Sequence, residues 1–308
     1  MIFVEILLLA LGFFMLVKGA DWFVDGTAGI AEKFGIPQLV VGLTIVAMGT
    51  SAPEAAVSIT AALKGTADIA VGNVVGSNIL NILVILGLTG LITSVAVQKS
   101  TLFYEIPYML LVTVVLMVMG MMGNSINFVE GIVLWVMFIL YLAYLFVLAK
   151  KGKQEEESKE TRKIWVLLGY AAVGGVVVVL GSNIAVDSAT AIAEIIGLSE
   201  KFIGLTIVAL GTSLPELVTS VTAARKGNAD IAIGNIVGSN IFNILFVLGT
   251  SALIIPITFE SSFVIDSIIA IAAGVLLWIS TIKTKKLTRP WGIVMLLCYA
   301  AYFVYLLF

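Results

Sequence analysis

Two glutamates in this sequence directly follow a proline, in a chain that is 60% hydrophobic. Glu54 ends the segment GLTIVAMGTSAPE, and Glu216 ends the closely similar segment GLTIVALGTSLPE. A carboxylate inside a membrane costs roughly 2.5–3.5 kcal/mol on insertion scales, so its presence indicates a function. Proline lacks the amide proton that a helix needs, and its ring displaces the carbonyl four residues back. We therefore expect a kinked or unwound turn beside each glutamate.

Each of these turns is surrounded by oxygen atoms. The missing proline donors predict backbone carbonyls without helical partners near residues 47–50 and 209–212. The adjacent side chains contribute hydroxyl groups at Thr50, Ser51, Thr212 and Ser213. Irregular backbone is tolerated at membrane depth only where it is buried in protein or lines a wet cavity.

A second segment supplies amide and further hydroxyl oxygens. Residues four apart stack on one face of a helix, which aligns Asn73, Ser77 and Asn81 in GNVVGSNILN. The segment GNIVGSNIFN repeats this face with Asn235, Ser239 and Asn243. We predict that the serines and the last asparagine of each segment belong to a site. The sequence leaves open whether the other four asparagines bind an ion or join helices: Asn73, Asn78, Asn235 and Asn240.

Together these groups form a dianionic set of oxygen ligands. The chain contains no histidine and one cysteine, Cys298, which lies in an apolar run. Oxygen ligands suit hard cations, and a flexible site with two carboxylates suits Ca²⁺ better than Mg²⁺. Hydroxyl and carbonyl oxygens at unwound helices also suit Na⁺. Competition of the two ions for one dianionic site is a sufficient mechanism for exchange.

The composition predicts an all-α integral membrane protein. Only 12% of the 308 residues are charged, whereas soluble domains have about a quarter. Continuous apolar runs of about 20 residues have the length of membrane-spanning helices. We expect ten of them, near residues 2–31, 37–63, 68–95, 103–121, 127–149, 164–194, 199–224, 229–256, 262–282 and 290–308.

The chain contains an internal repeat. Residues 42–81 align without a gap on residues 204–243 and are identical at 29 of 40 positions, at an offset of 162. The expected organisation is a first repeat (1–149), a charged linker (150–163) and a second repeat (164–308). Each half has five expected helices, an odd number, so the two repeats should lie in the membrane in opposite orientations. Inverted repeats of this kind are typical of secondary transporters, with the site at the repeat interface.

The positive charges predict the orientation. Fourteen Lys and Arg residues fall in loops on the side of the linker, against two, Lys64 and Lys201, in loops on the other side. By the positive-inside rule, the linker is cytoplasmic and both termini are external. Four acids near the ends of the long first and sixth helices are explained by caps, pairing or a hydrated vestibule: Asp21, Asp25, Asp187 and Glu194. Asp68 and Asp230 are interpreted as helix-start acids.

The paired GTSAPE and GTSLPE motifs, each followed by GSN and a further asparagine, resemble the α-repeats of the sodium/calcium exchanger family, within the calcium/cation antiporter superfamily. The resemblance covers both repeats and fits the whole ten-helix length. It implies that Glu54 and Glu216 bind Ca²⁺ with help from carbonyls at Thr50 and Thr212. It implies Na⁺ sites or neighbouring contacts at eight other positions: Ala47, Ser51, Ser77, Asn81, Ala209, Ser213, Ser239 and Asn243.

The resemblance also implies an activity. Family members exchange about three Na⁺ for one Ca²⁺ by alternating access, with the long first and sixth helices sliding past the rest. We therefore expect a transporter and not an enzyme, with these ions and the lipid bilayer as partners and with no cofactor, nucleic acid or obligatory protein partner. The compact form suggests a prokaryotic plasma membrane.

Two other kinds of transport remain as alternatives. K⁺-transporting family members typically carry an aspartate where this chain has Asn243, and proton-coupled relatives usually read Gly-Asn before the acid, where this chain has Gly-Thr-Ser. Both differences favour Na⁺ coupling over K⁺ or H⁺ coupling. A passive channel with carboxylates in its pore is the third possibility, and ion flux without a counter-ion would distinguish it.

Overall fold

Helices make up almost the whole of the computed structural model, which describes residues 2–65, 68–152, 160–197 and 209–307. In lipid every backbone polar group needs an internal partner, and a helix provides one within its own segment. Eight helices in the described residues are long and apolar enough to span a membrane. The helices over 38–50 and 52–63 form a bent pair that adds a ninth span if counted as one.

The predicted spans agree with these helices to within a few residues where the structure describes them. The predicted helix 199–224 lies partly outside the described residues, as do residues 153–159 of the predicted linker. On the two sides of that gap, helix α8 (Phe128–Lys151) ends and helix α9 (Ile164–Ile195) begins.

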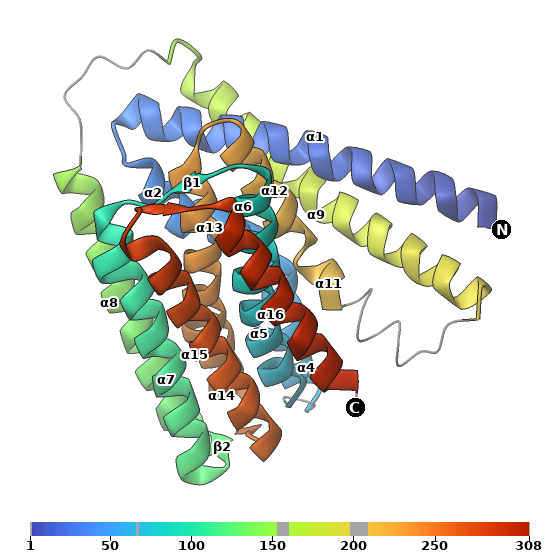
Figure 1. Ribbon diagram of the computed structural model, residues 1–308, viewed down its shortest axis with the longest axis vertical. Helices are drawn as coiled ribbons and strands as arrows, with labels where there is room; N and C mark the ends of the chain where they lie inside the picture. Colours follow the sequence, from blue (N-terminus) through green and yellow to red (C-terminus); the bar gives the residue numbers. More distant parts are fainter. Residues whose placement is uncertain (1, 66–67, 153–159, 198–208, 308) are drawn as a thin grey trace.

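Two long helices, α1 (Ile2–Phe34) and α9, run antiparallel and side by side across one end of the molecule (Figure 1). Glycines on α1 allow this close approach. A Cβ atom at Gly12 would lie 2.7 Å from the backbone nitrogen of Ala185, and one at Gly26 would lie 2.4 Å from that of Ala171. Small residues at such contacts let membrane helices pack by close van der Waals contact.

The centre of the molecule consists of two helical rods that carry the repeated asparagine segments. The first contains α5 (Asp68–Leu80), the π-helical segment η2 (Asn81–Leu86) and α6 (Gly87–Ile92). The second contains α13 (Ala229–Phe242), the π-helical segment η5 (Asn243–Leu248) and α14 (Gly249–Ile254). Within its most apolar window, 94% of the second rod is buried, against 17% of α1. These rods therefore form the core.

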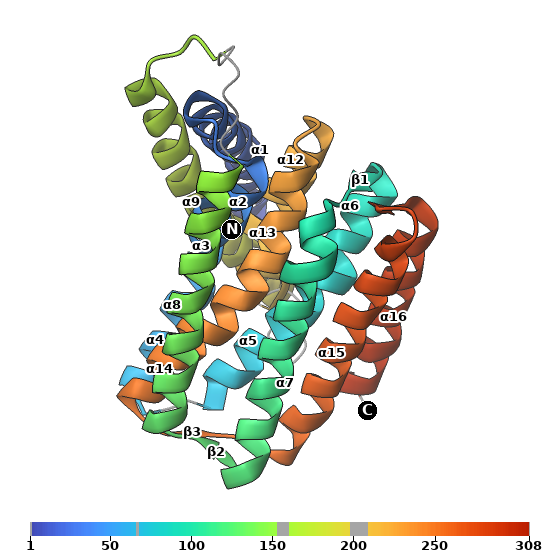
Figure 2. The same ribbon diagram turned by 90° about the vertical axis from the view of Figure 1, so that its left-hand side faces the viewer.

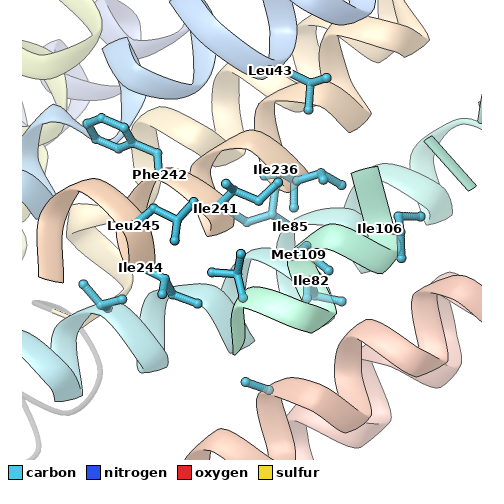
Figure 3. Close-up of a cluster of buried hydrophobic side chains, with 14 of the residues drawn as sticks. Leu43, Ile82, Ile85, Ile106, Met109, Ile236, Ile241, Phe242, Ile244 and Leu245 are labelled. Atoms are coloured by element: carbon cyan, nitrogen blue, oxygen red, sulfur yellow. The ribbon is translucent and has the colours of Figure 1, made fainter. Parts of the chain in front are cut away.

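Apolar side chains fill the space between the rods and their neighbours. Figure 3 shows Ile82 and Ile85 of η2 beside Met109 of α7 (Ile106–Gly123), close to Ile241 of α13. The four side chains are at most 2% exposed. A core that is apolar and tightly packed fixes the rods, and with them the polar groups that they carry.

Two broken helices pack against the rods. The first break separates α2 (Gln38–Val41), η1 (Gly42–Val46) and α3 (Ala47–Thr50) from α4 (Ala52–Leu63), with a bend of 51°. The second separates α11 (Ala209–Thr212) from α12 (Leu214–Arg225). Both breaks fall directly before the prolines, as predicted.

Four outer helices complete the bundle: η3 (Thr101–Glu105) continuing into α7, then α8, α15 (Ser261–Ile282) and α16 (Arg289–Leu307). Figure 2 shows α7 and α8 on the outer side.

Pairs of short strands connect some of the loops. The all-α prediction did not include these strands. Antiparallel pairs form between β1 (Val95–Ala96) and β4 (Lys286–Leu287), and between β2 (Ser125–Ile126) and β3 (Ile257–Thr258). Each strand has one fully buried apolar residue, namely Val95, Leu287, Ile126 or Ile257. Two-residue strands are too short to show a periodic pattern in the sequence.

Candidate cation site

Glu54 and Glu216 lie in the first turns of α4 and α12, and neither has any exposed surface. The residues before these helices, Ser51 and Ser213, leave helical geometry with ψ values of 8° and 7°. The positive end of a helix dipole stabilises a carboxylate in its first turn. The broken helices thus place both acids where their charge is best tolerated.

Each carboxylate accepts a hydrogen bond from a serine of the other repeat. The Ser213 hydroxyl donates to Glu54 Oε1 at 3.1 Å, and the Ser51 hydroxyl donates to Glu216 Oε1 at 2.8 Å. Ser77 joins the first pair, with its hydroxyl 3.4 Å from Glu54 Oε1 and 3.1 Å from the Ser213 hydroxyl. The structure therefore brings both predicted acids and three of the predicted serines into one cluster.

Four asparagines connect the two central rods. The amides of Asn78 and Asn240 each donate to the other residue's backbone carbonyl, at 3.1 and 3.2 Å. Asn81 Nδ2 donates to Asn240 Oδ1 at 3.0 Å, and Asn243 Nδ2 donates to Asn78 Oδ1 at 3.3 Å. Because an amide nitrogen only donates, this network fixes which end of each side chain carries the oxygen.

The same network leaves four acceptor oxygens unpaired. Glu54 Oε2, Glu216 Oε2, Asn81 Oδ1 and Asn243 Oδ1 are buried, and none has a hydrogen-bond donor. A buried acceptor without a partner costs about 1–3 kcal/mol, and more when it is charged. Bound hard cations would satisfy all four oxygens, since carboxylate and amide oxygens are ligands of this class of ion.

Apart from the two glutamates, the oxygen atoms of the candidate site belong to neutral groups. In the described part of the chain, no three Asp, Glu, His or Cys side chains gather at one point. The negative charge at the cluster is therefore that of the two glutamates, and the other oxygens are hydroxyls, amides and carbonyls.

The prediction of a partnerless carbonyl at Ala47 is wrong. Its oxygen accepts the backbone N–H of Ser51 at 3.0 Å, and the Ser239 hydroxyl lies 3.4 Å away. Pro53 lacks an N–H, and the carbonyl that loses its donor for this reason is the one four residues back, at Gly49. The helix therefore continues up to Thr50. Ser239 accordingly approaches the break of the first repeat, from the opposite rod.

At the second break, the carbonyl of Gly211 lacks a helical donor, because residue 215 is a proline, and it accepts a hydrogen bond from the Ser182 hydroxyl at 2.9 Å. Ser182 was not predicted, because it lies in α9, outside the aligned repeat segments. Ala209 starts α11, and its side chain lies outside the described residues.

The two threonines of the motifs differ in their surroundings. The Thr50 hydroxyl donates to Asn235 Oδ1 at 3.0 Å, and the side chain is 1% exposed. Thr212 lines a cavity of about 420 Å³ together with Pro53, Asn183 and Asp187. This cavity reaches the broken helices from one side. Its lining includes Asp187, for which the sequence left a cap, pairing or a vestibule open, and the cavity favours the vestibule.

Asn73 and Asn235, which the sequence left open, join helices. The Asn73 amide donates to the Glu54 carbonyl at 3.3 Å and to the Ser58 hydroxyl at 2.9 Å. Asn235 repeats both contacts with the Glu216 carbonyl, at 3.5 Å, and with Ser220, at 2.9 Å. They hold the backbone of each glutamate against a central rod. Ser58 and Ser220 were not predicted, although both lie four residues after a glutamate, on the same helix face.

Three of the remaining acids also have structural explanations. Lys226 Nζ lies 3.2 Å from Asp21 and 2.8 Å from Asp25, which pairs α1 with the end of α12. Asp230 lies in the first turn of α13 and accepts a hydrogen bond from Gln98 at 2.6 Å.

Comparison with known proteins agrees with this geometry. The family described as sodium/calcium exchanger protein matches residues 4–147 and 166–308. The sodium/calcium exchanger MaX1 of Methanosarcina acetivorans is 37% identical, over all of both chains, and the putative antiporter CaxA of Alkalimonas amylolytica is 37% identical over 96% of each. A solved structure of the sodium–calcium exchanger NCX_Mj superposes with a TM-score of 0.86 at 32% identity, covering 99% of this chain and 100% of that chain.

This chain is a multi-pass helical membrane protein, and the family that it matches is one of ion transporters and not of enzymes. Within that class, this chain belongs to the sodium/calcium exchanger family.

Proposed function

We propose that the protein exchanges Na⁺ for Ca²⁺ across the membrane at the cluster around Glu54 and Glu216. The observation that carries the proposal is the set of four buried, unpaired acceptor oxygens. Two come from carboxylates and two from asparagines, one of each kind from each repeat. One Ca²⁺ neutralises both charges, and Na⁺ ions at overlapping positions do the same.

Each of the predicted residues has a role in this proposal. Glu54 and Glu216 bind Ca²⁺ together with the carbonyls of Thr50 and Thr212. The hydroxyls and amides of the cluster, with the carbonyls of Ala47 and Ala209, provide Na⁺ sites or their neighbouring contacts: Ser51, Ser213, Ser77, Ser239, Asn81 and Asn243. About three Na⁺ per Ca²⁺ would then make the exchange electrogenic.

The arrangement in the membrane follows the predicted ten helices in two inverted repeats, 1–149 and 164–308, joined by the linker 150–163. The hydrogen bonds between Asn78 and Asn240 support this pair of inverted repeats, because the amide of each residue donates to the backbone carbonyl of the other. The strand pairs support it as well, because β1 and β2 of the first half pair with β4 and β3 of the second. We place the linker in the cytoplasm and the termini outside a plasma membrane.

Alternating access accounts for a cavity that reaches the site from one side. The cavity beside Thr212 and Asp187 lies towards the end of α9 that is next to the N-terminus of α1. On the other side, the ion pairs of Lys226 close α12 against α1. This conformation is open to the outside in the proposed orientation, and movement of α1 and α9 would exchange the two sides.

The test is uptake of radioactive Ca²⁺ into proteoliposomes loaded with Na⁺ and diluted into Na⁺-free buffer. We expect uptake only with the outward Na⁺ gradient, and no uptake driven by imposed K⁺ or H⁺ gradients. Uptake driven by either of those gradients would overturn Na⁺ coupling, and Ca²⁺ flux without any counter-ion would indicate a channel.

A further inference from the structure

A second cavity, of about 500 Å³, lies between α7 and α8. Figure 2 shows these two helices on the outer side of the bundle. Four tyrosines line it: Tyr104, Tyr108, Tyr141 and Tyr144. Several of its walls face outward, since Tyr104 and Leu140 are each 63% exposed and Phe103 is 57% exposed. In a membrane protein such an outward face meets lipid, so a ligand would enter from the bilayer.

One carboxylate belongs to this aromatic cavity. Glu105 lines it and is only 1% exposed, and the Tyr144 hydroxyl donates to its Oε1. Its second oxygen, Oε2, is buried without a hydrogen-bond partner. The Tyr141 hydroxyl is likewise buried without a partner. Neither group has a part in the exchange site, so the cavity wall contains two acceptors that the proposed function does not use.

The four tyrosines form two pairs of rings in the cavity wall, and aromatic cages are built from side chains of this kind. The rings of Tyr108 and Tyr141 stack with centroids 5.5 Å apart, and those of Tyr104 and Tyr144 are tilted with centroids 6.4 Å apart. The faces of aromatic rings attract ammonium groups, and such cages recognise them in many proteins. A carboxylate in the same wall supplies the opposite charge.

Depth in the membrane identifies the source of the ammonium group. Glu105 is the fifth residue of the apolar helix Thr101–Gly123, hence about 7 Å from its end at 1.5 Å per residue. That depth is the boundary between lipid headgroups and acyl chains. At the same end, α8 terminates in Lys150 and Lys151, which place positive charge on the water side, where a lipid phosphate lies.

We propose that this cavity binds the headgroup of an ethanolamine phospholipid. The primary ammonium lies among the tyrosine rings and donates hydrogen bonds to Glu105 Oε2 and Tyr141 Oη, while the acyl chains lie along the outer surfaces of α7 and α8. A primary ammonium has three donors for these two acceptors, whereas the quaternary ammonium of choline has none. Both oxygens are buried in the structure, so binding requires side chains of the cavity wall to turn aside.

Bound lipid would lie one helical turn from a contact with the exchange site. Met109 is four residues after Glu105, and its sulfur lies 3.7 Å from Asn240 Nδ2. Asn240 in turn accepts the Asn81 amide. The ligand thus stabilises the position of α7 against the central rods.

The test measures lipid binding and does not depend on transport. Full-length protein in detergent is mixed with equal amounts of palmitoyl-oleoyl phosphatidylethanolamine, phosphatidylcholine and phosphatidylglycerol, and bound lipid is identified by native mass spectrometry. We expect the ethanolamine lipid to be retained about tenfold over the other two, and Glu105→Gln to remove that preference. Tyr141→Phe should reduce it several-fold, and it provides a second variant should the glutamate variant fail to fold.

Asp266→Asn is the matched control. Asp266 also lies in an outer helix and accepts a tyrosine hydrogen bond, from Tyr302 at 2.9 Å, but it does not line this cavity. The control should keep the preference for ethanolamine lipid. Equal retention of the three lipids by the unchanged protein would overturn the proposal. An ethanolamine preference that survives both Glu105→Gln and Tyr141→Phe, or phosphatidylcholine bound as well as phosphatidylethanolamine, would also overturn it.

Discussion

Residues 42–81 and 204–243 have nearly the same sequence and different surroundings. Thr50 is buried against Asn235, whereas its equivalent Thr212 lines a cavity. The Gly211 carbonyl accepts the Ser182 hydroxyl, whereas Ala20 stands at the position equivalent to Ser182 and has no hydroxyl to offer Gly49. One chain thus contains the same repeated motif in a buried setting and beside a cavity.

The residues that differ between the repeats account for this difference. Ala52 and Ala56 line the cavity beside α9. Their equivalents, Leu214 and Val218, pack against a cluster that includes Leu16 and Ala20 of α1. Larger side chains fill the interface of α12 with α1, and the alanines leave the interface of α4 with α9 hollow. In the proposed function, the identical positions therefore form the ion site, and the different ones determine which side of it is open.

The largest predicted effect is on Ca²⁺ uptake, and it tests the glutamates that the two repeats share. Glu54→Gln and Glu216→Gln should each lower Na⁺-driven Ca²⁺ uptake by more than about a hundredfold, because a site of two charges that loses one no longer neutralises a divalent ion. Uptake into proteoliposomes measures this. Asp266→Asn, which removes an acid from an outer helix, should leave uptake unchanged. Full exchange in either glutamate variant would contradict the site.

The next effect tests what the halves do not share. In a Cys298→Ser background, Thr212→Cys should react with an impermeant thiol reagent at least about tenfold faster than Thr50→Cys, because a buried residue reacts only when the structure opens locally. The rates can be followed by mass increase of the protein in proteoliposomes. Equal rates would show that the two sides are equally open in solution.

Much of this architecture could be predicted from the sequence, for identifiable reasons. The broken helices could be predicted from Pro53 and Pro215. The polar cluster could be predicted from the spacing of four residues between Ser77 and Asn81, because both signals are local in the sequence. The paired roles of Asn78 and Asn240 were not predictable, since they depend on which helices face each other. The cavity was not predictable either, although its cause, alanines opposite Leu214 and Val218, is visible in the alignment.

A moderate effect is expected from exchanging those side chains. Ala56→Val fills part of the cavity and should lower the reaction rate of Thr212→Cys about three- to tenfold, because burial of about one further methyl group favours the closed side by roughly 1 kcal/mol. Val218→Ala should do the reverse and raise the rate of Thr50→Cys. If both substitutions change the two rates in the same direction, side-chain size does not determine which side is open.

The smallest effect concerns the ion pairs that close the second side. Lys226 and its partners Asp21 and Asp25 are each about one-third exposed, and ion pairs of this kind contribute about 0–1 kcal/mol. Lys226→Gln should therefore raise the reaction rate of Thr50→Cys only about two- to fivefold. Added salt should reproduce part of the increase by screening the same charges. Lys64→Gln is the matched control, because Lys64 is the equivalent residue of the first repeat and has no ion pair in the described part of the chain. The same increase in both variants would mean that net charge, and not the contact with α1, holds this side closed.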